Sequence, residues 1–172
     1  GSIHFNHRLR VVNYKNDHVT SLDFGNEQIA IGPGDRVILA VPPSVAHTLM
    51  PEIVTPDAFR PIVNGHFRVP KKSKDVSFMG LVGSIAHWLF VRGDVVSITV
   101  SAATDLVPRS NSDIADCLWS DICIALDLGD CLMGEHRIVK EKRATFAQTP
   151  EQLLKRPGAK TQWQNLALAG DW

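Results

Sequence analysis

Short apolar segments closed by turn residues are the feature that most constrains the fold of this chain. Gly32-Pro33-Gly34-Asp35 and Pro42-Pro43 each end a run of strand length near the start. Farther along, Arg92-Gly93-Asp94 separates residues 87–91 from residues 95–102. Turn residues at such short intervals predict several β-strands, and the last of these turns predicts a hairpin.

One longer segment has a helical period instead. Within residues 112–128, apolar side chains recur at four-residue spacing and form a single stripe. The stripe consists of Ile114, Leu118, Ile122 and Leu126. Asn111 or Ser112 can cap the start of this helix, and Gly129 can end it. With one clear helix among many strands, the pattern alone predicts a mixed α/β or α+β domain.

Three other segments carry local predictions. The continuous apolar run Arg36–Val41 is typical of a strand buried on both faces, as in a parallel sheet. Residues 44–50 have the spacing of a short helix that begins with proline in its first turn. The basic cluster in residues 70–75 predicts a solvated polar loop.

The charge balance excludes whole classes of partner. Eighteen basic and eighteen acidic residues give no net charge among the 172, so nothing draws the chain toward nucleic acid. A low net charge gives little protection against self-association, so a second copy of the chain, in a homodimer, is a candidate partner. No apolar run approaches the ~20 residues of an integral membrane segment. We expect a cytoplasmic chain, with peripheral membrane attachment as an alternative.

Motifs for metal binding or nucleophilic catalysis are missing from the sequence. The seven histidines form no HExxH pattern, and the spacing of Cys117, Cys123 and Cys131 fits no zinc site, so no metal is expected. The sequence also lacks a GxSxG elbow, a Walker A loop and a GxGxxG fingerprint. Composition and spacing alone therefore leave the function open.

An ordered set of longer motifs goes further. They are Arg36-Val37-Ile38-Leu39-Ala40-Val41-Pro42-Pro43, Phe59-Arg60-Pro61-Ile62-Val63-Asn64-Gly65-His66-Phe67-Arg68, Gly80-Leu81-Val82-Gly83, His87-Trp88-Leu89-Phe90, Gly93-Asp94-Val95-Val96-Ser97, Val100-Ser101-Ala102-Ala103, Lys140-Glu141-Lys142-Arg143-Ala144-Thr145-Phe146-Ala147-Gln148-Thr149-Pro150 and Asn165-Leu166-Ala167-Leu168-Ala169-Gly170-Asp171-Trp172. In this order and spacing they resemble the squalene-associated FAD-dependent desaturases, or hydroxysqualene dehydroxylases, of the flavin-containing amine oxidoreductase superfamily. The resemblance covers nearly the whole chain. It implies the α+β fold class, with a mixed, mainly antiparallel β-sheet and a few helices.

The same resemblance implies that the chain is a fragment. Relatives begin with a GxGxxG segment and continue past Gly-Asp-Trp into a loop and helix that meet the flavin. By this resemblance, residues 1–50 supply strands of the FAD-binding domain, residues 51–145 form the substrate-binding domain, and residues 146–172 return to the FAD-binding domain. FAD is the implied cofactor of the full-length enzyme, and we expect the chain alone neither to retain it nor to be active. The missing FAD-domain segments are then its natural partners.

The resemblance also assigns candidate site residues. Seven of them are expected to lie against the cofactor: Leu9, Val41, Pro42, Pro43, Gly170, Asp171 and Trp172. An apolar tunnel for a long isoprenoid substrate is expected to be lined by Phe78, Leu81, Trp88, Phe90, Val96 and Ile98. Arg143, Thr145 and Gln148 lie in a segment that runs toward the flavin in relatives, and one of them could hold the departing hydroxyl.

The implied reaction is the reductive removal of the hydroxyl of hydroxysqualene to give squalene, in hopanoid and isoprenoid biosynthesis. Its chemistry belongs to the flavin. Two alternatives remain at this point. The chain could be a piece of a phytoene desaturase- or amine oxidase-type flavoenzyme, or it could be a cofactor-free module that binds an apolar ligand or another protein.

Overall fold

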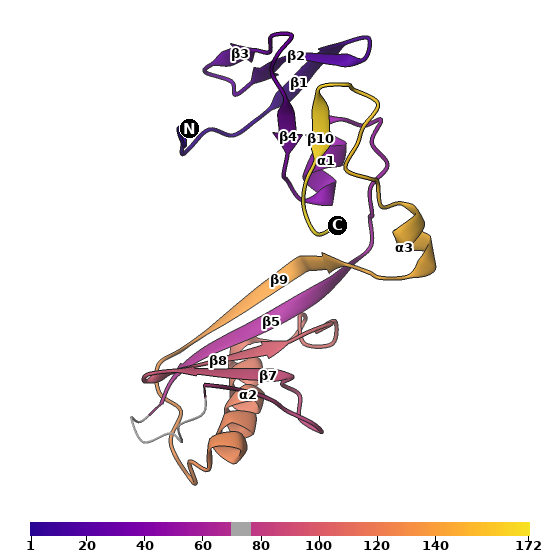
Figure 1. The fold of residues 1–172 in the computed structure, drawn as a ribbon. Helices are drawn as coiled ribbons and strands as arrows, with labels where there is room; N and C mark the ends of the chain where they lie inside the picture. Colours follow the sequence, from indigo (N-terminus) through magenta and orange to yellow (C-terminus); the bar gives the residue numbers. More distant parts are fainter. Residues whose placement is uncertain (70–76) are drawn as a thin grey trace. The chain divides into compact units, whose positions relative to one another are not determined.

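Two compact units make up the described part of the chain, which is residues 1–69 and 77–172 of a computed structural model (Figure 1). Unit 1 combines Gly1–Ala58 with Phe146–Trp172, and unit 2 contains Phe59–Thr145. The resemblance places residues 51–58 in the middle segment, whereas in the structure they cluster with unit 1. The predicted polar loop at residues 70–75 lies outside the described residues.

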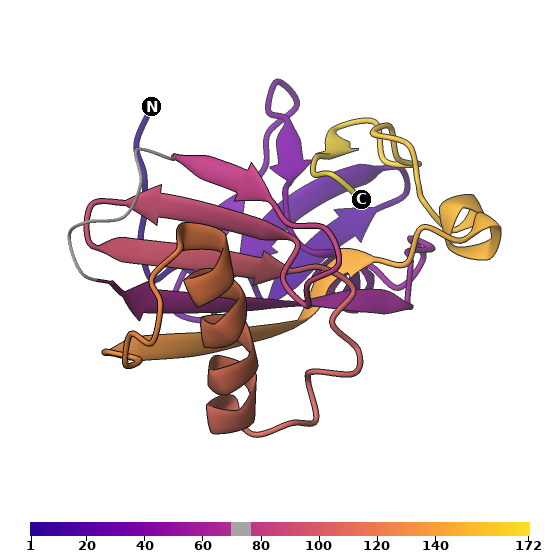
Figure 2. The ribbon, with the colours of Figure 1, turned by 90° about the horizontal axis from the view of Figure 1, so that it is seen from below.

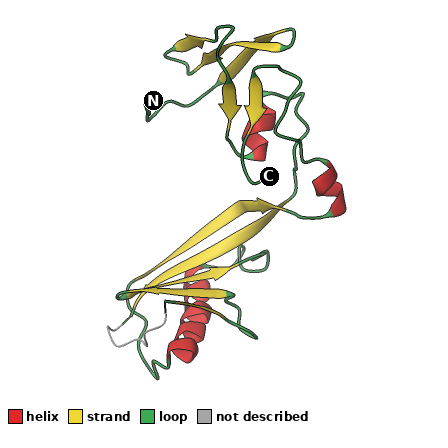
Figure 3. Cartoon of the chain, viewed as in Figure 1, coloured by secondary structure: helices red, strands yellow, loops and turns green. Residues whose placement is uncertain are grey.

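Unit 2 is built on a five-stranded sheet in the order β6-β7-β8-β5-β9. In Figure 3 its strands are yellow and its helix is red. Its strands are β5 (Phe59–Arg68), β6 (Phe78–Gly80), β7 (Trp88–Arg92), β8 (Val95–Val100) and β9 (His136–Phe146). Strands β5 to β8 pair with antiparallel neighbours. The hairpin predicted at Arg92-Gly93-Asp94 joins β7 to β8, and Gly93 has a φ of 63° there, a conformation that glycine adopts readily.

Helix α2 (Asn111–Leu126) lies across one face of this sheet (Figure 2). Its predicted apolar stripe is buried in a single core together with β5 and β8 residues such as Phe67 and Ile98. The helix begins one residue earlier than the predicted caps allow, because the Ser110 hydroxyl accepts the Asp113 backbone N–H at 3.0 Å. It ends before Gly129 because Asp127 already takes the left-handed conformation, with a φ of 56°.

Unit 1 contains two small sheets and two short helices. Its elements are β1 (Val11–Lys15), β2 (His18–Asp23), β3 (Gln28–Ala30), β4 (Val37–Leu39), α1 (Pro43–Leu49), α3 (Pro150–Leu154) and β10 (Leu166–Leu168). Strands β1, β2 and β3 form an antiparallel sheet, and β4 pairs in parallel with β10. Short, mostly antiparallel strands with few helices confirm the predicted α+β class.

The run Arg36–Val41 does form a strand, but the prediction that it is buried on both faces is wrong for the described residues. Val37 and Leu39 are buried, whereas Ile38 between them is 69% exposed. Strand β4 has only β10 as a neighbour in a two-stranded sheet, and no second layer among the described residues covers the face that carries Ile38. The apolar composition of the run was therefore a poor guide to its burial here.

Asn165 forms hydrogen bonds between the two separate segments of unit 1. Its side chain is buried, its Oδ1 accepts the Val19 backbone N–H at 2.8 Å, and its Nδ2 donates to the Val19 carbonyl at 2.9 Å. Val19 belongs to β2, and Asn165 directly precedes β10. One amide side chain therefore satisfies both backbone groups of a residue 146 positions away in the sequence.

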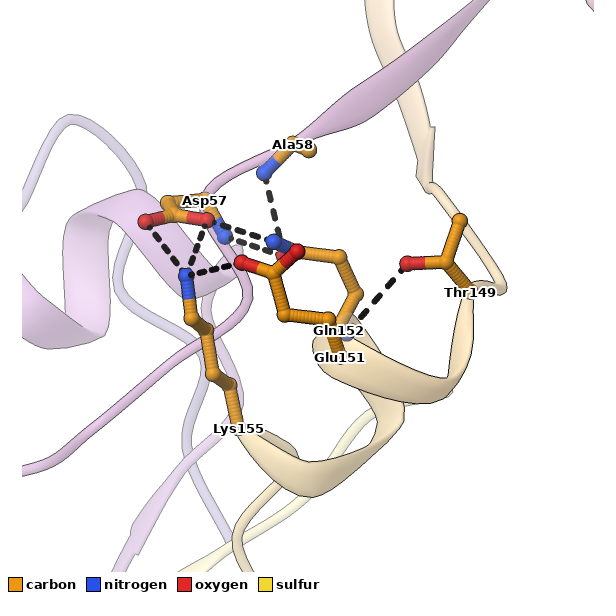
Figure 4. Close-up of polar contacts among 6 residues, drawn as sticks. All are labelled: Asp57, Ala58, Thr149, Glu151, Gln152 and Lys155. Carbon is orange, nitrogen blue, oxygen red and sulfur yellow. Dashed lines mark hydrogen bonds and ion pairs between the residues drawn. The ribbon is translucent and has the colours of Figure 1, made fainter.

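A second buried amide holds the segment that precedes β5 (Figure 4). Gln152 of α3 accepts the backbone N–H groups of Asp57 and Ala58 at 2.9 and 3.1 Å, and it donates to an Asp57 carboxylate oxygen at 2.7 Å. Lys155 donates to both oxygens of the same carboxylate. Mainly because of the Lys155 hydrogen bond, the pKa of Asp57 falls below its usual value, and the pKa of Lys155 rises in return.

Candidate functional site

The first candidate surface lies at the carboxyl ends of the parallel strands β4 and β10. Pro42 precedes α1 and Pro43 is its first residue, so the chain turns from β4 directly into a helix. Beside it, the Ala169 backbone N–H donates to the Leu39 carbonyl at 3.1 Å, which carries the parallel pairing beyond β10. The carboxyl ends of parallel strands are where ligands bind in open α/β sheets.

Trp172 connects the two strand ends. Its indole N–H donates to the Val41 carbonyl at 2.8 Å. Gly170 lies beneath this indole with a φ of 143°, and a Cβ added to Gly170 would come within 2.9 Å of the indole nitrogen. Only glycine fits without displacing Trp172. Of the residues predicted to meet the cofactor, Gly170 and Trp172 therefore pack against each other, and Val41 accepts the hydrogen bond from Trp172.

A cavity of about 480 Å³ brings Leu9 to the same region. Leu9 and Val41 line it together with Val45 and Leu49 of α1, while Arg8 and Arg10 supply positive charge; Thr48 completes the lining. Apolar walls beside two guanidinium groups suit a flat apolar ring that carries anionic groups.

Gly170 and Trp172 also line a second cavity of about 510 Å³. Arg156 is part of its wall, and the Arg156 guanidinium donates to the Asp171 carbonyl at 3.5 Å. All seven residues predicted to contact the cofactor therefore lie at these strand ends or along the adjoining cavity. Arg8, Arg10 and Arg156 are additions that the sequence reasoning missed, because isolated arginines in a chain of zero net charge give no motif.

The second candidate surface is the face of the unit 2 sheet opposite to α2, hereafter the open face. The strand register lines up two rows of residues across four strands. One row is Phe78, Phe90, Ser97 and His66, and the other is Gly80, Trp88, Thr99 and Asn64. Directly paired residues share one face of a sheet, and the alternate residues Phe67, Ile98 and Leu89 are buried in the core that includes α2.

The open face is aromatic at one side and polar at the other. Phe78, Trp88 and Phe90 are 61%, 47% and 37% exposed, and the Phe78 and Phe90 rings stack with centroids 6.4 Å apart. On β8 and β5, the Thr99 hydroxyl donates to Asn64 Oδ1 at 2.7 Å. Such a face can contact an apolar chain at one end and a polar group at the other.

The six residues predicted to line a substrate tunnel occupy three different places. Phe78, Trp88 and Phe90 lie together on the open face. Val96 and Ile98 are fully buried in the core, and Leu81 is partly buried against it. Periodicity could separate the exposed residues from the buried ones only with the strand register and the position of α2, and neither can be read from the sequence.

The three residues proposed to hold a hydroxyl are also divided. Ile138 packs against the core and Lys140 donates to the carbonyls that precede α2, so alternation along β9 places Arg143 and Thr145 on the opposite face, the open one. Gln148 follows β9 as an exposed residue of unit 1. In residues 1–69 and 77–172, no three His, Cys, Asp or Glu side chains gather to form a metal site.

Comparison with a model of the flavin-containing amine oxidoreductase family matches residues 1–172. The chain belongs to the flavin-containing amine oxidoreductase family. Its members are defined by a flavin cofactor, and the strand-end surface of unit 1, with its glycine, its apolar cavity and its arginines, has the chemistry to bind one. None of the helices in the described residues has the length and apolar character needed to cross a membrane.

Curated members of the family resemble the whole chain. The hydroxysqualene dehydroxylases of Sinorhizobium fredii and Rhodopseudomonas palustris are each 40% identical to it over 171 residues, and that of Zymomonas mobilis is 38% identical over 170 residues. These matches cover 99% of this chain but 41% of each relative. The chain therefore spans about two fifths of the length of the curated relatives that it matches.

Solved structures of family type share the fold. An Exiguobacterium protein assigned as a protoporphyrinogen oxidase matches with a TM-score of 0.60 at 13% identity, over 94% of this chain and 41% of that one. The iminodiacetate oxidase of Chelativorans sp. BNC1 matches with a TM-score of 0.53 at 15% identity, over 92% and 42%. At these identities the likeness concerns the fold and not the substrate.

Proposed function

We propose that this chain is part of an FAD-dependent enzyme that reductively removes the hydroxyl of hydroxysqualene to give squalene. The observation that carries the proposal is the 40% identity to two hydroxysqualene dehydroxylases over 171 of its 172 residues. Identity at this level along the full chain favours a common reaction over a merely common fold.

The strand-end surface supports FAD as the flavin. FAD carries an adenine and a diphosphate that FMN lacks. The cavity with Leu9 and Val41 in its apolar lining is suited to a flat base, and Arg8 and Arg10 can pair with phosphate oxygens. Gly170 lines the adjoining cavity together with Arg156, which adds a further cation beside the end of β10.

The open face supports an isoprenoid substrate. A long isoprenoid alcohol needs an extended apolar contact and a place for one hydroxyl. Phe78, Trp88 and Phe90 offer the exposed apolar contact. The polar side chains on β5, β8 and β9 offer a place for the hydroxyl. The chain alone supplies one part of the flavin site, so we propose that it is inactive without the remaining segments of the enzyme.

The test uses the flavin-loaded enzyme that carries this chain at the full length of its relatives. The flavin is photoreduced without oxygen and mixed with hydroxysqualene, and squalene is measured by gas chromatography while flavin reoxidation is followed by absorbance. We expect one squalene for each flavin reoxidised. A flavin that stays reduced, with no squalene formed, would refute the proposed function.

A pair of variants tests the open face in the same assay. Phe78→Ser with Phe90→Ser should raise the KM for hydroxysqualene about tenfold or more, because two exposed aromatic contacts are lost. Val82→Ser is the matched control, since Val82 is fully exposed and lies outside the two rows. Equal KM values for both variants would remove the open face from the proposal.

A further inference from the structure

His66 occupies a distinctive position on the open face. It lies in the same row as Phe78, Phe90 and Ser97, and it is the only titratable side chain among the eight residues of the two rows. Its ring is exposed, and its Nδ1 lies 2.9 Å from the Ser97 hydroxyl oxygen. The Ser97 contact fixes the ring from one side, while Nε2, on the opposite edge of the ring, is directed away from that contact.

The position relative to the aromatic residues suits the two ends of a hydroxylated apolar ligand. Neighbouring strands in a sheet lie about 4.8 Å apart, so His66 on β5 is about two strand spacings from Phe90 on β7. A ligand whose apolar chain contacts Phe78 and Phe90 can therefore place a polar group within a few ångströms of the His66 ring. Ser97 lies between Phe90 and His66 and adds no bulk there.

We propose that His66 contacts the substrate hydroxyl and donates the proton with which that hydroxyl departs. This inference rests on the proposed function, and it adds the residue that assists cleavage of the carbon–oxygen bond. An allylic alcohol is a poor substrate for this cleavage because hydroxide is a poor leaving group. Protonation by a positioned acid lets the oxygen leave as water, and general acids of this kind contribute about 10²–10⁴-fold in rate.

The carbon–oxygen bond breaks with its electron pair going to oxygen, and the proton on His66 Nε2 moves to that oxygen, so that water leaves. The allylic carbon accepts a hydride, which a reduced flavin supplies when bound. The substrate is thereby reduced by two electrons, the hydride donor is oxidised by two, and His66 recovers its proton from water. With Nδ1 also protonated at the start, the Nδ1–H donates to the Ser97 hydroxyl.

The experiment compares two substrates in the full-length, photoreduced enzyme. Hydroxysqualene needs a proton at its leaving oxygen. Its acetate ester needs none, because the leaving group is acetate, a stabilised carboxylate. His66→Gln keeps a hydrogen-bond donor but cannot transfer a proton at neutral pH. We expect this variant to slow squalene formation from the alcohol about 100-fold or more while changing the rate from the acetate less than about fivefold.

His136→Gln is the matched control, because His136 lies on another strand of the same sheet and stacks on Phe67, a core residue. It should process both substrates at the wild-type rate. Wild-type rates with His66→Gln on the alcohol would overturn the proposal. An equal slowing on alcohol and acetate would also overturn it, since that pattern means loss of structure or of binding and not loss of an acid.

A binding measurement separates failure of this inference from failure of the proposed function. With the flavin oxidised no turnover occurs, and changes in flavin absorbance report the affinities for hydroxysqualene and for squalene. We expect His66→Ala to abolish the preference for the hydroxylated ligand and His66→Gln to keep it. If the wild type makes no squalene, the proposed function fails. A His66→Ala variant that retains the wild-type preference overturns the contact between His66 and the hydroxyl, whatever the enzyme makes.

Discussion

Units 1 and 2 are stabilised in different ways, although both are built mainly from short strands. The core of unit 2 is one apolar cluster in which α2 packs on its sheet, and none of the described residues of that core is polar. Unit 1 contains the two buried polar side chains of the described residues, Gln152 and Asn165. Each of them binds backbone that lies 94 or more residues away in sequence. Burial of apolar area therefore dominates in unit 2, and specific long-range hydrogen bonds matter more in unit 1.

The largest expected loss of stability comes from a substitution in the core of unit 2. Leu118 is fully buried on α2, and its Cδ1 lies 3.1 Å from where a Cβ on Gly65 would stand. Leu118→Ala should lower the free energy of unfolding by about 2–5 kcal/mol, because a cavity remains in a tightly packed region. Hydrogen exchange measured by mass spectrometry should show lost protection in β5, β8 and α2. Unchanged protection in these elements would contradict the apolar core as the source of stability.

The next largest loss of stability is expected when the hydrogen bonds between Asn165 and Val19 in unit 1 are removed. Asn165→Leu should lower the free energy of unfolding by about 1–3 kcal/mol, since the buried N–H and C=O of Val19 both lose their partner. Asn165→Asp is the matched comparison, because it keeps the acceptor for the Val19 N–H but places a buried carboxylate oxygen against the Val19 carbonyl. Chemical denaturation at neutral pH should rank Asp as at least as damaging as Leu. Wild-type stability of both variants would contradict these hydrogen bonds as a source of stability.

A smaller effect concerns the segment that precedes β5. Gln152→Leu preserves approximate volume but removes the acceptor for two backbone N–H groups, so we expect a loss of about 1 kcal/mol. The exchange of the Asp57 and Ala58 amides should accelerate most. Leu153→Ala in the same helix serves as the control, because Leu153 is about half exposed. If both variants accelerate these two amides equally, a general weakening of α3 is the cause.

The smallest effect is a dependence on pH. The pKa of Asp57 is lowered in the folded chain, so its contribution to stability is complete above the ordinary Asp pKa of about 3.9 and disappears as the pH falls through the lowered value. The pKa of Lys155 is raised, so its contribution disappears only as the pH rises through that raised value. Thermal unfolding of the wild type and of Lys155→Met should therefore differ most between these limits. A difference that persists unchanged into strong acid would exclude the ion pair as its origin.

The sequence predicted the local structure of unit 2 well because its signals are local. The four-residue stripe on α2 and the glycine of the β7–β8 hairpin depend only on neighbouring residues. The open face was less predictable, because Phe90 and Ile98 have similar hydrophobicity and are assigned to opposite faces only by register and by the side on which α2 packs. His66 was not identified for the same reason: its partner Ser97 is 31 residues away.

In unit 1, the strand ends were found through family motifs and not through physical pattern. Nothing in the residues near Leu9 indicates that it shares a cavity with Val41, since this requires the chain to return past α1. The exposure of Ile38 shows a different limit of the sequence. A run of apolar residues predicts a strand, but it does not show whether another part of the chain covers each face of that strand. Asn165 gave no signal at all, as a single asparagine before a strand is ordinary.

The discontinuity of unit 1 has a consequence for the order of events during synthesis. Phe59–Thr145 is one uninterrupted stretch, so unit 2 can complete its own contacts while the ribosome is still adding the residues that follow. Unit 1 cannot, because Val19 is made before unit 2 and its partner Asn165 is made only after it. Until then, the early strands hold backbone groups without their final partners, and a nascent chain that stalls before Asn165 would expose them to aggregation or to chaperones.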